Sequence, residues 1–278
     1  MELKEITYNP ALIKIFDEII INSVDEYKRK GSKLNTIKVT INREKGSISV
    51  WDNGGIEVVK HKEYDEWIPE MVFSNLKAGS NFSDDEQRVT AGLNGVGSVL
   101  TNIFSKELIV SICDGKNSFY QRYSNNMRER EKPSIKKGAK GFTEISFYPD
   151  LEKFGITEID EDHYKLIEKR VYDIAGCNPL LKVYLNGSLI DVKSFEDYIK
   201  FYTSESFFEV SKDKSWSIGI SHSDIGFQQV SFVNSTETYD GGNHVDYILN
   251  QIISELRDFF QKKHKVDVKP SELKNHIF

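Results

Sequence analysis

The segment FDEIIINSVDE, residues 16–26, is apolar enough for a buried helix, yet it carries acidic and amide side chains among its isoleucines. At about 100° per residue, Glu18, Asn22 and Asp25 fall within a helical stripe roughly 60° wide, and isoleucines flank it on both sides. Burying an acid and an amide costs several kcal/mol unless each finds a partner. An internal hydrogen-bond network would supply partners, but three polar residues in register favour a site that holds a metal ion and a base.

Composition predicts a globular protein with one large domain or two moderate ones. The chain has 278 residues, of which 38% are hydrophobic and 29% charged, which is ordinary for a soluble protein. The net charge of −6 argues against a surface devoted to nucleic acid, and basic runs such as 29–33, 136–140 and 262–269 are more often solvated loops. The two cysteines, Cys113 and Cys177, predict neither a disulfide framework nor a zinc site. Without a signal-peptide core or a long apolar run, we expect a cytosolic-type protein.

Periodicity and turn residues predict two α/β layers that join near residue 155. Besides the helix that contains residues 16–26, helices are predicted at 98–104, 161–176, 194–202 and 244–263. Strands are predicted at 36–41, 47–52, 107–113, 118–124, 142–149, 181–187, 216–223 and 227–235. The first two strands are separated by NREKG and form a hairpin, whereas residues 60–90 look polar and irregular.

Three short motifs follow the first helix. VWDNGGI places Asp52 at the end of an apolar strand, where it can accept a hydrogen bond from an exocyclic amino group, although Asp-Asn-Gly is also a common turn. GLNGVG, residues 92–97, precedes a helix and suits a phosphate, or else is an ordinary flexible loop; without Gly-Lys-Ser/Thr it is not a P-loop. KGFTEISFYPD starts a strand with Thr143, which by itself indicates only strand propensity.

The order of these motifs resembles the GHKL (Bergerat) ATPase fold of type II DNA topoisomerases, mismatch-repair MutL proteins, heat-shock chaperones and histidine kinases. The segments DEIIINSVDE, DDEQRVTAGLNGVGSVLTNIFS and SFVNSTETYDGGNHVDYILNQI are similar to the ATPase region of type II topoisomerases, both of T-even-type bacteriophages and of eukaryotes. The resemblance covers essentially the whole chain. It implies an α+β fold, with an ATP-binding α/β sandwich at residues 1–155 and a smaller α/β transducer domain at 156–278.

The resemblance also implies roles for single residues in a site that uses ATP and Mg²⁺. Glu18 would be the general base, Asn22 would ligate Mg²⁺, and Asp52 would bind the adenine amino group with support from Thr143. The other positions implied to contact the nucleotide are Asp25, Gly55, Ile56, Ser80, Asn81, Gly92, Leu93, Asn94, Gly95, Val96, Gly97 and Ser98. The motif DNGGI is one residue shorter than the family's Asp-x-Gly-x-Gly-Ile and lacks its arginine, so no partner is assigned to Glu26.

For function, the resemblance implies an ATP-binding and ATP-hydrolysing clamp that closes as a homodimer and couples this cycle to DNA strand passage. Its partners would be a transported DNA duplex, bound without sequence preference, and a cleavage and religation domain or subunit; no membrane is implied. We expect the cytoplasm of a bacterium or phage-infected cell, or the nucleus in a eukaryote.

The family's N-terminal arm and its glutamine-threonine-lysine loop would lie outside residues 1–278, so we expect an excised fragment or a natural minimal protein. One alternative function is a nucleotide-gated dimerisation module with little turnover of its own. The other is a MutL-like or chaperone-like GHKL protein, which the segment SFVNSTETYDGGNH disfavours.

Overall fold

The computed structural model describes residues 1, 3–76 and 95–278 and divides the chain into two compact units. The larger unit is Lys4–Asp191, and the smaller unit is Val192–Phe278 with the segment Met1–Leu3. The division falls after Asp191 and not after residue 155. The reason is that helix α4 (Glu161–Cys177) packs on α1 (Pro10–Lys30), and strand β8 (Lys182–Leu185) pairs with β1 (Thr36–Asn42), so both belong to the larger unit.

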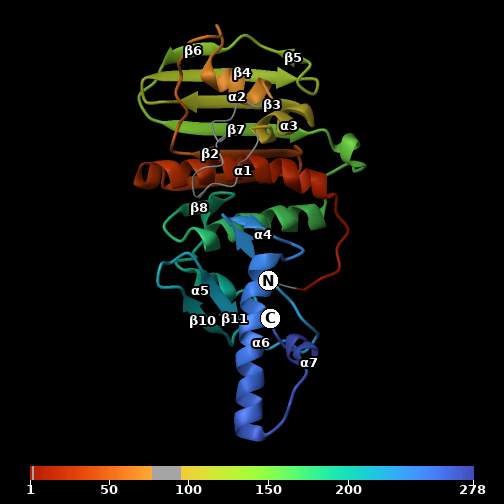
Figure 1. Cartoon of the computed structure of the whole chain (residues 1–278). Coiled ribbons are helices and arrows are strands. Elements are labelled where there is room, and N and C mark those ends of the chain that lie inside the picture. The colour runs from red at the N-terminus through yellow and green to blue at the C-terminus, as the bar shows by residue number, and fades with distance from the viewer. Residues whose placement is uncertain (2, 77–94) are drawn as a thin grey trace. The chain divides into compact units, whose positions relative to one another are not determined.

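The described strands of the larger unit form one sheet, in the order β5-β4-β3-β7-β2-β1-β8-β9, with β6 paired to β4 (Figure 1). Every pair is antiparallel except β1 with β8. The remaining strands are β2 (Ser47–Asp52), β3 (Ser105–Cys113), β4 (Asn117–Ser124), β5 (Glu129–Arg130), β6 (Ser134–Lys137), β7 (Phe142–Pro149) and β9 (Ser188–Leu189). The predicted hairpin of β1 and β2 is confirmed.

Helix α1 begins and ends where its sequence provides capping groups. The side chain of Asn9 accepts a hydrogen bond from the backbone N–H of Ala11 at 2.9 Å, Pro10 occupies the first turn, and the last turn is basic. Along its buried face Leu12, Phe16 and Ile20 are fully inaccessible. This apolar face, at a spacing of four residues, fixes how the helix is rotated against the sheet.

The larger unit also contains two short helices, α2 (Ile68–Ser74) and α3 (Gly97–Ile103), and the 3-10 turns η1 (Gly31–Lys33) and η2 (Leu151–Phe154). Helix α3 is tied to α1 by the hydroxyl of Thr101, which donates to the carbonyl of Ile15 at 2.9 Å. It is tied to α2 by Asn102, which donates to the carbonyl of Phe73 at 2.9 Å. Helix α2 lies within residues 60–90, which were predicted to be irregular.

The smaller unit contains helices α5 (Phe195–Ile199), α6 (Asn243–His264) and α7 (Pro270–Lys274) and two two-stranded sheets. The sheets pair β10 (Phe207–Val210) with β11 (Ser217–Ile220), and β12 (Phe232–Val233) with β13 (Thr236–Glu237). Its core is built from Leu249, Ile253 and Ile277. The predicted strand 227–235 is reduced to β12, because Asn234 and Ser235 have φ values of 52° and 68° and turn the chain.

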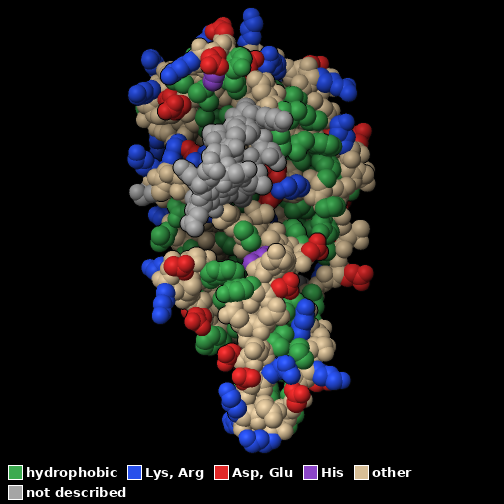
Figure 2. All heavy atoms as spheres, viewed as in Figure 1, with side chains coloured by type: hydrophobic (Ala, Val, Ile, Leu, Met, Phe, Trp, Pro, Cys, Tyr) green, Lys and Arg blue, Asp and Glu red, His purple; other side chains and the backbone are tan. Residues whose placement is uncertain are grey.

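None of the described helices combines the length and apolar character that a membrane span requires. Acidic and basic side chains are interspersed over the face of the molecule shown in Figure 2, in keeping with a net charge of only −6.

Candidate active site

Asp52 ends β2 on the buried face of the sheet. The burial of β2 alternates, so Asp52 lies on the same face as Ile48 and Val50 and is only 3% exposed. One carboxylate oxygen accepts the hydroxyl of Ser23 from α1 at 2.8 Å, and the other accepts the backbone N–H of Gly54 at 2.8 Å. Burial raises the pKa of Asp52, against the opposing effect of these two hydrogen bonds. Asp52 is therefore a fixed acceptor at the helix-facing surface of the sheet.

Thr143 lies directly opposite Asp52 in the antiparallel pairing of β7 with β2, and it is also buried. The turn after Asp52 passes close to the same strand ends. Gly55 has φ +82°, and a Cβ at this position would lie 2.1 Å from the carbonyl oxygen of Cys113. No other residue fits there without moving backbone. Ile56 follows and is half-buried.

Glu18 lies on α1, five residues before Ser23, the residue that binds Asp52. This spacing corresponds to a rise of roughly 7.5 Å along the helix. Its Oε1 is 2.6 Å from the Nζ of Lys14. Its Oε2 faces the start of α3, where a Cβ on Gly97 would fall 1.9 Å from it. Gly97 thus leaves the space that this carboxylate occupies, and the carboxylate remains partly accessible, with 26% of the side chain exposed.

The other two helical positions of the predicted site differ in exposure. Asn22 is exposed, so its amide is open to a ligand, whereas Asp25 is 1% exposed and belongs to the interior. Among the residues that the structure describes, no three His, Cys, Asp or Glu side chains converge on a common point for a metal ion. A divalent cation here would therefore take most of its ligands from water and from a phosphate group.

Glu26, for which no partner was predicted, is paired with two cations of its own helix. Lys30, one turn further along α1, lies 2.7 Å from Glu26 and donates to the carbonyl of Gly55 at 2.6 Å. Arg29 also pairs with Glu26, at 3.2 Å. A cation from the helix therefore reaches the glycine turn after Asp52, where the shortened motif has no arginine.

The glycine loop is described only at its end. Gly95 and Val96 are half-buried and lead into α3, where Gly97 and Ser98 are buried. Five predicted nucleotide contacts lie outside the described residues: Ser80, Asn81, Gly92, Leu93 and Asn94.

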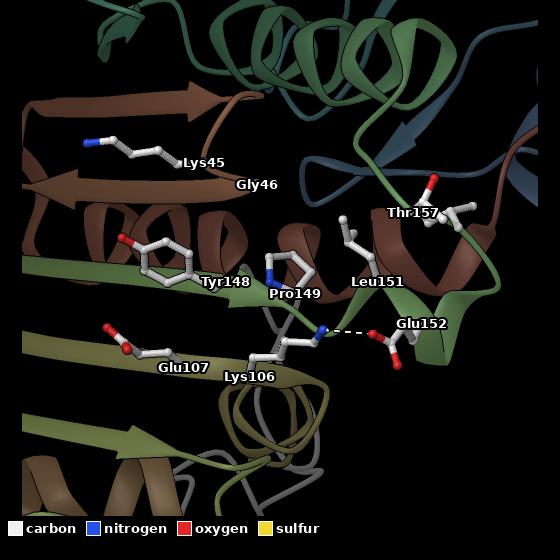
Figure 3. Close-up of a pocket in the computed structure, with 10 residues that line it drawn as sticks. Lys45, Gly46, Lys106, Glu107, Tyr148, Pro149, Leu151, Glu152 and Thr157 are labelled. Atoms are coloured by element: carbon white, nitrogen blue, oxygen red, sulfur yellow. Dashed lines mark hydrogen bonds and ion pairs between the residues drawn. The ribbon is translucent and has the colours of Figure 1, made fainter.

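A separate cavity of about 530 Å³ opens at the far end of β7, six residues beyond Thr143 and roughly 20 Å away along the strand. It is lined by Lys45, Lys106, Tyr148, Glu152 and neighbouring residues, none of them a predicted site residue (Figure 3). Lys106 is paired with Glu152 at 3.1 Å. This cavity is therefore distinct from the residues around Asp52 and Glu18.

Three contacts of the site were missed from sequence: Ser23 to Asp52, Lys14 to Glu18, and Lys30 to Glu26. The last two left a signal, because Lys14 and Glu18, and Glu26 and Lys30, are spaced four residues apart on a helix and so share a face. Ser23 left none, since its partner comes from a strand 29 residues away.

Comparisons with known proteins agree on one kind of relative. A family model described as DNA gyrase B matches residues 183–277. The chain is 42% identical over 294 aligned residues to DNA topoisomerase 2 top-2 of Caenorhabditis elegans, an alignment that covers 100% of this chain and 19% of that protein. The chain thus spans only a small part of the curated relatives it matches.

Solved structures give the same result at the level of the fold. The ATPase region of Saccharomyces cerevisiae topoisomerase II superposes with a TM-score of 0.92 at 37% identity, over 99% of this chain and 74% of that one. The ATPase and transducer domains of DNA topoisomerase II from Balamuthia mandrillaris superpose with a TM-score of 0.91 at 37% identity, over 99% of this chain and 72% of that one.

Proposed function

Because this chain belongs to the ATPase regions of type II DNA topoisomerases, we propose that it binds ATP with Mg²⁺ between Asp52 and Glu18 and hydrolyses it. One observation carries the proposal. A buried carboxylate beside a threonine at the sheet, and a partly exposed carboxylate facing a glycine at a helix start, are held by the same helix α1. In this proposal Asp52 accepts a hydrogen bond from the adenine, and Glu18 accepts a proton from the attacking water.

The adenine end fits the group it would hold. Asp52 accepts hydrogen bonds from Ser23 and Gly54, and an ionised carboxylate offers about four acceptor sites, so it can also accept one from an exocyclic amino group. Thr143 lies beside it on β7. A protonated Asp52 would present a donor in place of an acceptor. Because its pKa is raised, adenine binding should be lost at a higher pH on acidification than with an ordinary aspartate. Gly55 and Ile56, which follow Asp52 in the chain, would contact the adenine from the adjoining turn.

The phosphate end also fits. Asn22 offers an exposed amide oxygen to Mg²⁺, which prefers oxygen ligands and keeps several waters; when bound, the ion would neutralise charge on the phosphates. The triphosphate would be surrounded by the glycine loop, including Gly95, Val96, Gly97 and Ser98. Asp25, which is 1% exposed, would lie behind Asn22 in the interior. Glu18 would accept a proton from the attacking water. The water oxygen would bond to the terminal phosphorus while the bond from that phosphorus to ADP breaks.

The wider role is proposed on the same family membership. The larger unit would be the ATP-binding domain and the smaller unit the transducer domain. ATP binding would close a homodimeric clamp on a transported DNA duplex, and a cleavage and religation domain or subunit would act on the second duplex. Its similarity to eukaryotic topoisomerases supports a place in the nucleus. If the chain instead belongs to a phage or bacterial enzyme, as the resemblance to T-even-type subunits implies, it would act in the cytoplasm of the host cell.

The nucleotide assignment is tested by Asp52→Asn. The amide can present a donor to the adenine amino group, and leaving that buried pair unsatisfied costs about 1–3 kcal/mol, so affinity is expected to fall by about 5- to 150-fold. Calorimetric titration with a non-hydrolysable ATP analogue measures this. Asp150→Asn, which changes another buried carboxylate at the opposite end of β7, is the control and should keep wild-type affinity. Unchanged affinity in a folded Asp52→Asn protein would remove Asp52 from the adenine site.

A further inference from the structure

We propose that Lys14 positions the catalytic carboxylate of Glu18, and that Lys14 is itself held in place by an ion pair between α1 and α4. The inference rests on the proposed function, because it assigns Glu18 as the base. It adds a residue outside the predicted site and connects the reaction to helix α4.

The contacts form a chain of alternating charge. Lys14 Nζ lies 2.6 Å from Glu18 Oε1 and 3.7 Å from Asp17 Oδ2. Asp17 Oδ1 lies 2.6 Å from the Nε of Arg170, which comes from α4 and is 3% exposed. Beside it on α4, Lys169 pairs with the buried Asp173 at 3.0 Å. One lysine thus bridges two neighbouring carboxylates, and the inner one is anchored to another helix.

The geometry gives the two oxygens of Glu18 different environments. Oε1 is occupied by Lys14, while Oε2 faces Gly97 at the start of α3. A general base needs one oxygen aimed at the water and needs the carboxylate prevented from rotating. By holding Oε1, Lys14 leaves Oε2 as the oxygen that faces the glycine loop. The α3 residues Gly97–Ile103 carry no charged side chain that could do this instead.

Stability alone does not explain the Lys14–Glu18 pair. The lysine side chain is 59% exposed, and exposed pairs of this spacing contribute little to folding. The order, with lysine before glutamate along the helix, is also the less stabilising of the two. Although burial acts to lower it, the pKa of Lys14 is raised by its hydrogen bond to Glu18 and by the charges of Glu18 and Asp17, so Lys14 stays charged throughout the neutral range. The effect of removing it should therefore appear in turnover and not in folding.

The test compares Lys14→Met and Lys14→Arg in the full-length protein by steady-state ATP hydrolysis. Loss of the cation lets the carboxylate rotate, so Lys14→Met is expected to lower kcat by about 10- to 100-fold, in the range that small misplacements of a catalytic group produce. KM should change less than about twofold, because the lysine does not contact the nucleotide. Lys14→Arg should restore most of kcat. The matched control is Lys165→Met, since Lys165 is 58% exposed and pairs with Glu168 at 2.7 Å on α4.

Three outcomes are decisive. A kcat for Lys14→Met equal to or above that of the wild type overturns the inference, and a higher value would show that Lys14 restrains the base. A rise in KM as large as the expected fall in kcat, with kcat itself unchanged, would make Lys14 a binding residue and would also overturn the inference. Glu18→Ala measured in parallel separates the two levels: if it hydrolyses ATP normally, the proposed base is wrong, whereas loss of turnover there with normal Lys14→Met activity rejects only the positioning role.

Discussion

Glu18→Ala is expected to bind ATP with nearly unchanged affinity and to hydrolyse it about 10²–10⁴-fold more slowly, the range that general-base catalysis contributes. The affinity should persist because the carboxylate faces the start of α3, where water would be activated, whereas the proposed adenine contacts are Asp52 and the glycine turn. Removing the base also leaves Asn22 and the loop in place. Binding and turnover should therefore separate cleanly in this variant.

Calorimetry with a non-hydrolysable ATP analogue and a steady-state phosphate-release assay on the same preparation measure the two quantities. Glu168→Ala is a suitable control, because Glu168 is a partly exposed glutamate paired with a lysine on α4. Wild-type turnover in Glu18→Ala would mean that another residue is the base. A protein that binds the analogue but shows no turnover even as wild type would favour a nucleotide-gated module over an ATPase.

The elements that could be predicted are those whose local pattern already determines them. Helix α1 followed from the spacing of its apolar residues, and the β1–β2 hairpin followed from alternation on either side of a glycine turn. Helix α2 was missed because it has no side-chain cap at its start and lies within a polar stretch that was read as irregular. The parallel pairing of β8 with β1 joins strands more than a hundred residues apart, and no local signal reports it. That pairing is what moved the boundary between the units past α4.

The site divides in the same way. Asp52, Gly55 and Gly97 could be predicted because each position restricts the residue type. Asp52 ends a strand, Gly55 has a positive φ, and Gly97 lies against the carboxylate of Glu18. The polar stripe was read as an acid and an amide on a buried helix face, but its members have different surroundings, since Asn22 is exposed and Asp25 is buried. The groups that hold these side chains depend on packing between segments, and the sequence does not contain that information in local form.

The ion pair between Asp17 and Arg170 is the clearest case. The two residues are 153 positions apart, and in a helical pattern Asp17 looks like a surface residue beside Glu18. In the folded protein both side chains are buried, and the pKa of Arg170 is raised, although burial acts to lower it, because the carboxylates of Asp17 and Asp173 lie close by. The guanidinium thus neutralises charge at the contact between α1 and α4.

Arg170→Met is accordingly expected to lower the free energy of unfolding by about 3–5 kcal/mol, the usual cost of breaking a buried ion pair by removing one partner. Methionine fills much of the arginine's volume, so the loss reflects the Asp17 carboxylate left in the interior without the guanidinium. Urea unfolding at neutral pH measures it, and Arg43→Met is the control, because Arg43 pairs with Glu161 of the same helix but is 40% exposed. That control should lose no more than about 1 kcal/mol.

A second variant identifies the cause. Combining Arg170→Met with Asp17→Leu replaces the pair by apolar side chains and should recover a large part of the lost stability, since a buried pair exchanged for well-packed hydrophobic residues is often neutral. If the double variant is as unstable as Arg170→Met, the arginine acts through its packing, and the α1–α4 contact does not depend on charge.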